Sequence, residues 1–155
     1  LLMKSGVQAF EDVKKGEATE AVEDIAEADI LLSGVGFESG GLAAAHAIND
    51  GFAQVPQAHG MLHGEKVAYG TLCQLVLEKA PAEEFDKVFN FCKTVGLPTK
   101  LADLGITNVI DEEIKAVAAA ACVRTQSTKN LPFPVTEEDV VAAIYKVDEI
   151  GRARA

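Results

Sequence analysis

The spacing of apolar residues constrains the fold of this chain more than any other feature, because it follows the period of an α-helix along nearly the whole sequence. Apolar side chains recur three or four residues apart in successive segments: Val7, Phe10 and Val13; Val22, Ile25 and Ala26; Phe85, Val88, Phe89 and Cys92. Such spacing gathers these side chains on one face of a helix, and no alternating pattern of strand residues competes with it. The sequence therefore predicts an all-α fold, a bundle-like domain of about seven helices.

Residues that start or stop helices mark several of the expected boundaries. Pro81 is followed by Glu83 and Glu84, which favours a helix start there. Gly96 and Pro98 predict the end of the same helix after residue 95.

Two more helices are expected in the second half of the chain. Thr136 stands three residues before Asp139 and ahead of an apolar run, which is typical of a capping box at a helix start. Residues 111–123 are rich in alanine, the profile of a helix that packs closely between neighbours. The main connections between helices are expected at residues 14–20, 53–62 and 125–135.

Length and composition predict a single helical domain over residues 1–155. The chain has 155 residues, of which 48% are hydrophobic. A domain of this size buries roughly 70% of its unfolded surface. The net charge of -10 repels phosphate backbones and anionic lipids, so we expect neither nucleic acid nor a membrane as a partner.

We expect the protein to be cytoplasmic. Cys73, Cys92 and Cys122 are far apart and form no Cys-x-x-Cys pair, which argues against a disulfide framework or a thiolate metal site. No basic leader opens the chain, and no apolar run approaches the roughly 20 residues of a membrane span. Because the first three residues are apolar and no cap precedes them, we expect a piece of a longer protein.

The segment 33–46 departs from this helical pattern. It reads SGVGFESGGLAAAH and holds four glycines within eight positions. Glycine in a helix interior costs about 1 kcal/mol relative to alanine, so such clustering indicates close backbone approach to a neighbouring helix or a ligand. Ser39 is expected to cap a helix that runs through His46 to about Asn49 and ends at Gly51.

His46 and His63 are the candidate metal ligands. A lone histidine among alanines is more often a hydrogen-bonded core residue, and for His46 that alternative stays open on this helix alone. His63 opens the next expected helix, where the helix dipole disfavours a protonated imidazole and leaves a lone pair free for a metal. Two antiparallel helices can bring both imidazoles to one point. A catalytic zinc commonly takes three protein ligands, so one is still missing.

Three nearby polar residues are expected to have less direct roles. His59 lies in the loop between the two histidines, where solvation or support of a ligand is favoured over ligation. Glu65 is in a first turn, where the helix dipole favours a carboxylate. Lys66 is expected to be a solvated surface residue.

Four stretches carry a family resemblance: SGVGFESGGLAAAH at 33–46, HGEKVAYGTL at 63–72, QLVLE at 74–78 and VGLP at 95–98. They resemble the glycerol dehydrogenases of the iron-containing alcohol dehydrogenase superfamily. Because these stretches extend over most of the chain, the chain resembles the carboxy-terminal domain of that family, which has a dehydroquinate synthase-like fold.

The resemblance implies a two-domain enzyme of which this chain is one part. In the family, an amino-terminal Rossmann-like domain binds NAD, a helical domain holds a catalytic zinc, and the substrate lies in the cleft between them. His46 and His63 are thereby implied as zinc ligands, with an aspartate upstream of the matched region as the third. The dinucleotide-binding glycine motif is absent from this sequence, as expected if the Rossmann-like domain lies outside it.

The resemblance also implies a substrate and a reaction. Glycerol and NAD are converted to dihydroxyacetone and NADH by a large homo-oligomer, with zinc as the Lewis acid; this chain alone is expected to be inactive. Phe37 matches an aromatic residue beside the bound polyol, although an ordinary core phenylalanine is the alternative. The sequence departs from the family at Asn49 and Asp50, where many relatives have a His-Asn pair, which puts metal preference and ligand support in question.

Two other functions stay open. One is another polyol or alcohol dehydrogenase of the same superfamily, including iron-dependent ones, which substrate preference and metal content would separate. The other is a non-catalytic helical oligomerisation module whose histidines are structural. An upstream Rossmann-like domain in the gene favours the enzyme over the module.

Overall fold

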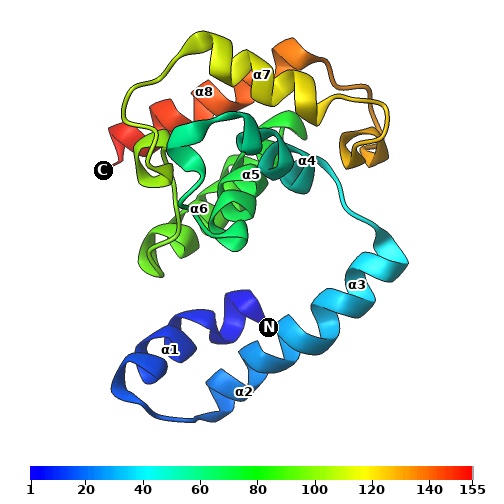
Figure 1. Cartoon of the computed structure of the whole chain (residues 1–155). Helices are drawn as coiled ribbons and strands as arrows, with labels where there is room; N and C mark the ends of the chain where they lie inside the picture. Colours follow the sequence, from blue (N-terminus) through cyan, green and yellow to red (C-terminus); the bar gives the residue numbers. More distant parts are fainter. Residues whose placement is uncertain (155) are drawn as a thin grey trace. The chain divides into compact units, whose positions relative to one another are not determined.

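The computed structural model describes residues 1–154, which form helices and short connections (Figure 1). The α-helices are α1 (Leu2–Lys15), α2 (Glu20–Glu27), α3 (Ser33–Gly40), α4 (Ala44–Gly51), α5 (His63–Leu77), α6 (Ala82–Thr94), α7 (Asp111–Ala121) and α8 (Glu137–Ala153). A π-helical segment, Ala28–Leu32, joins α2 and α3 into one continuous helix, so the eight labelled helices make seven separate rods. No strand occurs among the described residues. The prediction of an all-α fold with about seven helices is confirmed.

The described residues divide into two compact units. The first contains Leu1–Gly41 with Thr94–Gly96, and the second contains Leu42–Lys93 and the residues from Leu97 onward. The prediction of one domain over residues 1–155 therefore stays a prediction. Within residues 1–154, no helix combines the length and the apolar character needed to cross a membrane.

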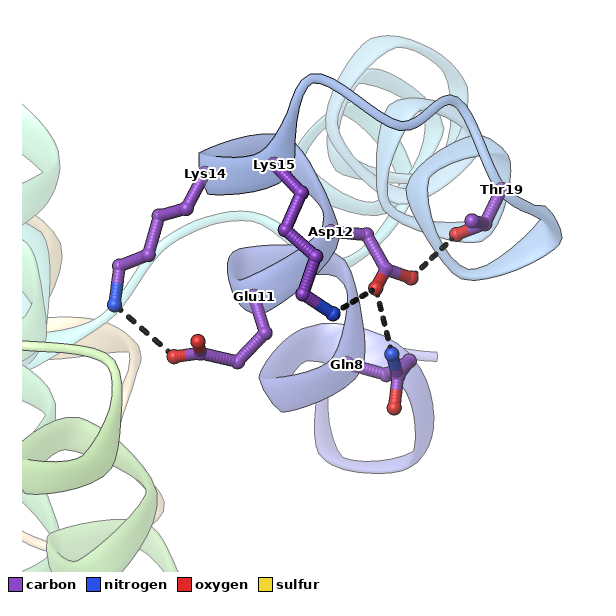
Figure 2. Close-up of polar contacts among 6 residues, drawn as sticks. All are labelled: Gln8, Glu11, Asp12, Lys14, Lys15 and Thr19. Atoms are coloured by element: carbon purple, nitrogen blue, oxygen red, sulfur yellow. Dashed lines mark hydrogen bonds and ion pairs between the residues drawn. The ribbon is translucent and has the colours of Figure 1, made fainter.

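The first unit is a helical hairpin held together by polar contacts. Helix α1 ends at Gly16, whose φ of 76° suits glycine, and the chain returns as α2 after Thr19, within the connection predicted at 14–20. In Figure 2, the side chains of Gln8, Lys15 and Thr19 converge on the carboxylate of Asp12. Gln8 Nε2 and Thr19 Oγ1 donate to it at 2.7 Å each, and Lys15 Nζ lies 3.5 Å away.

Asp12 is buried, and its hydrogen bonds stabilise the ionised form of its side chain. The hydrogen bond from Thr19 lowers the pKa of Asp12 below its usual value, with Gln8 and Lys15 acting in the same direction. The only other buried residues of α1 are Ser5 and Ala9, and α2 buries none. Ser5 Oγ donates to Asp24 on α2. Polar contacts therefore fix this hairpin more than an apolar core does.

The second unit has an apolar core built around α5. Helices α4 and α8 both pack on α5, and α7 packs on α4 and α8, so that α5 runs through the middle of the unit (Figure 1). The largest buried side chains are Tyr69, Phe52, Phe89, Ile48, Leu72, Leu101, Leu104, Ile106, Ile114 and Ile144. Tyr69 keeps its hydroxyl satisfied by donating to the Ile144 carbonyl at 2.8 Å. Burial of this apolar surface is the main stabilising term of the unit.

Glycines permit the closest contacts between these helices. A Cβ on Gly70 of α5 would lie 2.4 Å from the carbonyl oxygen of Ala45 on α4. A Cβ on Gly51 of α4 would lie 2.5 Å from the carbonyl oxygen of Val117 on α7. Since no side chain fits at either point, the backbone of α4 is in direct contact with both neighbours.

Most of the predicted boundaries agree with the structure. Helix α6 follows Pro81, and α8 begins after Thr136, whose Oγ1 accepts from the Asp139 backbone N–H at 3.2 Å while the Asp139 carboxylate accepts from Thr136 N–H at 2.9 Å. Helix α7 ends at Ala121, two residues before the predicted end. The connections expected at 53–62 and 125–135 lie outside the α-helices, apart from short 3₁₀ turns.

The prediction that Ser39 caps the helix of His46 is wrong. Ser39 belongs to the last turn of α3, and α4 begins only at Ala44. The break falls at Gly41, whose φ of 75° and ψ of -170° lie outside the helical region and end α3. The predicted end at Gly51 is correct for α4, although the chain continues into a 3₁₀ turn, Phe52–Gln54.

Three glycines of the 33–46 segment do not make the close contact to a neighbouring helix that the sequence predicts. A Cβ on Gly34, Gly36 or Gly40 would meet no atom within 4 Å. The alternative, close approach to a ligand, stays a prediction. The glycines that do contact a neighbouring helix are Gly51, expected only as a helix end, and Gly70, which the sequence pattern did not mark.

Gly70→Ala should destabilise the second unit, because its new methyl group overlaps the Ala45 carbonyl and forces α4 and α5 apart. We expect a loss of about 1–3 kcal/mol, the usual cost of overpacking. Gly64→Ala is the matched control on the same helix, since a Cβ there meets no atom within 4 Å. The control should gain roughly 0.5–1 kcal/mol from helix propensity. Urea unfolding followed by circular dichroism measures both, and equal effects of the two substitutions would contradict the packing described.

The stability of the α1–α2 hairpin should fall in acid, because the pKa of Asp12 is lowered in the folded state. Its contribution is fully present above the unfolded pKa of about 4 and is lost as the pH falls through the lower folded value. Asp12→Asn should therefore be less stable than the parent at neutral pH and lose less on acidification. Thermal melts between about pH 7 and 3 test this, with Glu11→Gln, an exposed neighbour, as the control. Parallel pH profiles for the parent and Asp12→Asn would refute it.

Candidate metal centre

The structure brings His46 and His63 together. His46 is the third residue of α4 and His63 is the first residue of α5. Their ring centroids are 5.6 Å apart and the ring planes are inclined at 47°. The predicted convergence of two imidazoles from consecutive α-helices is thus present in the second unit.

The close approach of α4 and α5 accounts for this meeting. Beside the Ala45–Gly70 contact, Gln74 Oε1 accepts from the backbone N–H of Ala45 at 3.0 Å. That bond satisfies one of the donors left free at the start of α4. It also attaches the residue next to His46 directly to α5.

The chain that leads into α4 is held from the opposite side by the connection between α7 and α8. Ser127 Oγ donates to the Ala43 carbonyl at 2.8 Å, and Asn130 Nδ2 donates to the Leu42 carbonyl at 2.8 Å. Together with the Gln74 contact, these bonds fix both the position and the direction of the first turn of α4. His46 lies in that turn, so its backbone is preorganised.

Glu65 fixes the start of α5 in a similar way. Its Oε2 accepts from the Leu62 backbone N–H at 2.7 Å, so that the carboxylate spans the first turn in which His63 lies. We expected a carboxylate there only for its favourable interaction with the helix dipole. The capping bond gives Glu65 a positioning role for His63 as well.

The electrostatic environment keeps His46 neutral. Partial burial lowers the pKa of His46 below its usual value, the nearby His63 lowers it further, and Asp50 opposes them. At neutral pH the imidazole is therefore deprotonated and can offer a nitrogen lone pair. Metal binding requires that neutral form.

The donor set fits a zinc ion or a similar first-row metal, and it is incomplete. A tetrahedral zinc bonded at roughly 2.0–2.1 Å to two imidazole nitrogens holds the ring centroids about 5 Å apart, close to the observed separation. However, no group of three or more His, Cys, Asp or Glu side chains suited to a metal occurs within residues 1–154. The third protein ligand expected from the sequence stays a prediction.

Asn49 and Asp50, where the sequence departs from the family pattern, lie one turn beyond His46. Asn49 Nδ2 donates to Asp50 Oδ1 at 3.0 Å. Asn49 is only 5% exposed, and its Oδ1 is buried without a hydrogen-bond partner. A buried acceptor without a donor costs free energy, and the sequence alone did not identify this feature of Asn49.

Two other residues, His59 and Phe37, were also predicted to contribute to the site. The His59 ring is bonded through Nε2 to the Ala53 carbonyl at 3.0 Å within its own loop, which gives that ring a local structural role. Phe37 is part of α3 in the first unit and is 54% exposed. Both interpretations of Phe37, a contact with substrate and an ordinary core residue, stay predictions.

The chain is similar over nearly its whole length to several known enzymes. It is 49% identical to glycerol dehydrogenase from Citrobacter freundii over 151 residues, which are 97% of this chain and 41% of that enzyme. It is 42% identical to glycolaldehyde reductase from Halobacterium salinarum over 97% of this chain and 41% of that protein. The crystal structure of a probable glycerol dehydrogenase from Sinorhizobium meliloti 1021 superimposes with a TM-score of 0.95 at 45% identity, covering 99% of this chain and 43% of the other. No family model matches the sequence.

These similarities agree with the all-helical fold. The chain is homologous to the glycerol dehydrogenases and spans about two fifths of the length of the curated relatives it matches. This partial coverage is consistent with a carboxy-terminal helical domain. The resemblance inferred from the sequence is confirmed.

Replacing either histidine by alanine in the longer polypeptide should reduce zinc binding, because each imidazole supplies one of a small number of ligands. We expect affinity to fall by more than about 100-fold, beyond the effect typical of residues that only support a ligand. His59→Ala is the matched control, since His59 is bonded within its own loop. Competition titration with a zinc chelator measures the affinities. Unchanged zinc affinity in both His46→Ala and His63→Ala would refute the assignment.

Proposed function

We propose that this chain is the metal- and substrate-binding part of an NAD-dependent glycerol dehydrogenase. The observation that carries the proposal is the convergence of His46 and His63, with ring centroids 5.6 Å apart, in a chain homologous to glycerol dehydrogenases over nearly its whole length. The missing donor fits this function too, because an aspartate outside the chain is expected to complete the zinc site.

The reaction takes a proton from a hydroxyl group of glycerol and a hydride from carbon 2, giving dihydroxyacetone, with NAD as the hydride acceptor. When bound, zinc supplies Lewis acidity that favours the deprotonated hydroxyl. His46 and His63 would hold and orient the metal, and the lowered pKa of His46 favours its neutral form. Glu65 and Gln74 hold the first turns of their helices, so that the two nitrogen donors keep a fixed separation.

The remaining parts of the site lie outside this chain in our proposal. A Rossmann-like amino-terminal domain binds NAD, and the substrate occupies the cleft that it forms with the helical part, with Phe37 beside the polyol. The complete protein is a cytoplasmic homo-oligomer. The 155-residue chain alone is inactive, because it lacks the third ligand and a recognisable NAD site.

A second candidate function is reduction of a small hydroxyaldehyde by an enzyme of the same superfamily. The relative from Halobacterium salinarum, named glycolaldehyde reductase, is 42% identical to this chain. Such an enzyme is compatible with the same histidine pair. Substrate preference and metal content distinguish the two.

The longer polypeptide, purified with zinc, should produce NADH from glycerol, and this chain alone should not. Absorbance at the NADH wavelength follows the reaction, with glycolaldehyde and NADH tested in the reverse direction. A higher kcat/KM for glycolaldehyde than for glycerol or dihydroxyacetone would favour the second candidate. NADH production by the 155-residue chain alone would overturn the proposed division of the site.

A further inference from the structure

The second half of the long helix in the first unit exposes large apolar side chains that are not covered within that unit. Five large apolar side chains of residues 30–40 are between 45% and 80% exposed: Ile30, Leu31, Leu32, Val35 and Phe37. The consecutive residues Ile30, Leu31 and Leu32 point in different directions around the helix axis, and the exposed polar residues of the same segment are Ser33, Glu38 and Ser39. An exposed apolar patch of this kind marks a surface that binds another protein segment.

Three glycines on the same segment leave room for close contact with another backbone. A Cβ at Gly34, Gly36 or Gly40 would meet no atom within 4 Å. Elsewhere in this chain, glycines such as Gly51 and Gly70 lie where a neighbouring backbone comes within 2.5 Å of a Cβ position. We call these five apolar side chains and three glycines the 30–40 helix surface. Its glycines could likewise admit a close backbone, but no neighbouring segment of the described chain lies against them.

The first unit cannot bury this surface by itself. Ala9 is its only fully buried apolar side chain, and the hairpin depends on the polar contacts of Asp12 and Asp24. The first three residues of the 30–40 helix surface belong to a π-helical segment, Ala28–Leu32. Such segments are rare in proteins and often lie at functional sites.

We propose that the 30–40 helix surface is the docking surface for a helical segment of the same longer polypeptide, from the part that precedes Leu1. The chain accounts for 41% of the length of its glycerol dehydrogenase relative, so about three fifths of such a protein lies outside it. A second copy of the chain is the alternative occupant, in which a symmetric pair of chains would bury this surface against itself. The proposal rests on the proposed function, in which that preceding part supplies the third zinc ligand.

Cysteine labelling in the longer polypeptide tests the proposal. Val35→Cys is placed in a Cys122→Ser background, because Cys122 is partly exposed while Cys73 and Cys92 are buried. Glu27→Cys is the matched control, an exposed and charged position on the same continuous helix. The probe is 5,5′-dithiobis(2-nitrobenzoate), and the same variants are labelled in the 155-residue chain.

In the longer polypeptide, Val35→Cys should react at least about tenfold more slowly than Glu27→Cys, while in the 155-residue chain the two rates should agree within about threefold. Equal rates in the longer polypeptide would overturn the proposal. Protection of position 35 in the short chain that increases with protein concentration would identify a second copy as the occupant and would also overturn it.

Activity and zinc content of the same preparations separate this inference from the proposed function. If the enzyme is active and zinc-loaded but position 35 is labelled rapidly, the docking proposal is refuted and the proposed function is supported. If the protein is inactive and zinc-free but position 35 is protected, the proposed function is refuted and the docking proposal is supported.

Discussion

The contact between the backbones of α4 and α5 is the constraint on which the rest of the second unit depends. Because Gly70 has no side chain, the Ala45 carbonyl can lie against α5, and the Ala45 N–H is satisfied by Gln74 on the same helix. This contact sets the distance between the two helices, and hence the distance between His46 and His63. The proposed metal site requires a narrow range of donor separations, so in that proposal the glycine acts through geometry alone.

The two units are stabilised by different interactions. The second has a large apolar core and uses polar groups to fix the ends of helices, as with Thr136 at the start of α8. The first unit has almost no apolar core and is held by hydrogen bonds to two aspartates. A hairpin of this kind has little stability of its own in water, since apolar burial is the dominant favourable term in folding. Its apolar helix is therefore best understood as one side of a larger interior.

The fold was largely predictable from the sequence because helical periodicity and capping act locally. The boundaries of α6 and α8 follow from Pro81 and Thr136, whose effects extend over a single turn. Ser39 was misassigned because a serine can stand either before the first turn of a helix or within the last turn of the preceding one. The backbone conformation of Gly41, which ends α3, decided between the two positions. The partners of Gly70 and the unsatisfied Oδ1 of Asn49 depend on residues distant in the sequence, so no local pattern reveals them.

The candidate site was predictable to the extent that it resembles a known family. Helix α3 carries an uncovered apolar surface, and α4, which follows after a short linker, carries His46, one of the two predicted metal ligands. Large exposed apolar patches mark interaction sites, and a catalytic zinc commonly takes three protein ligands. In our proposals, the part of the longer polypeptide outside this chain covers the apolar surface of α3 and supplies the third ligand to the two histidines.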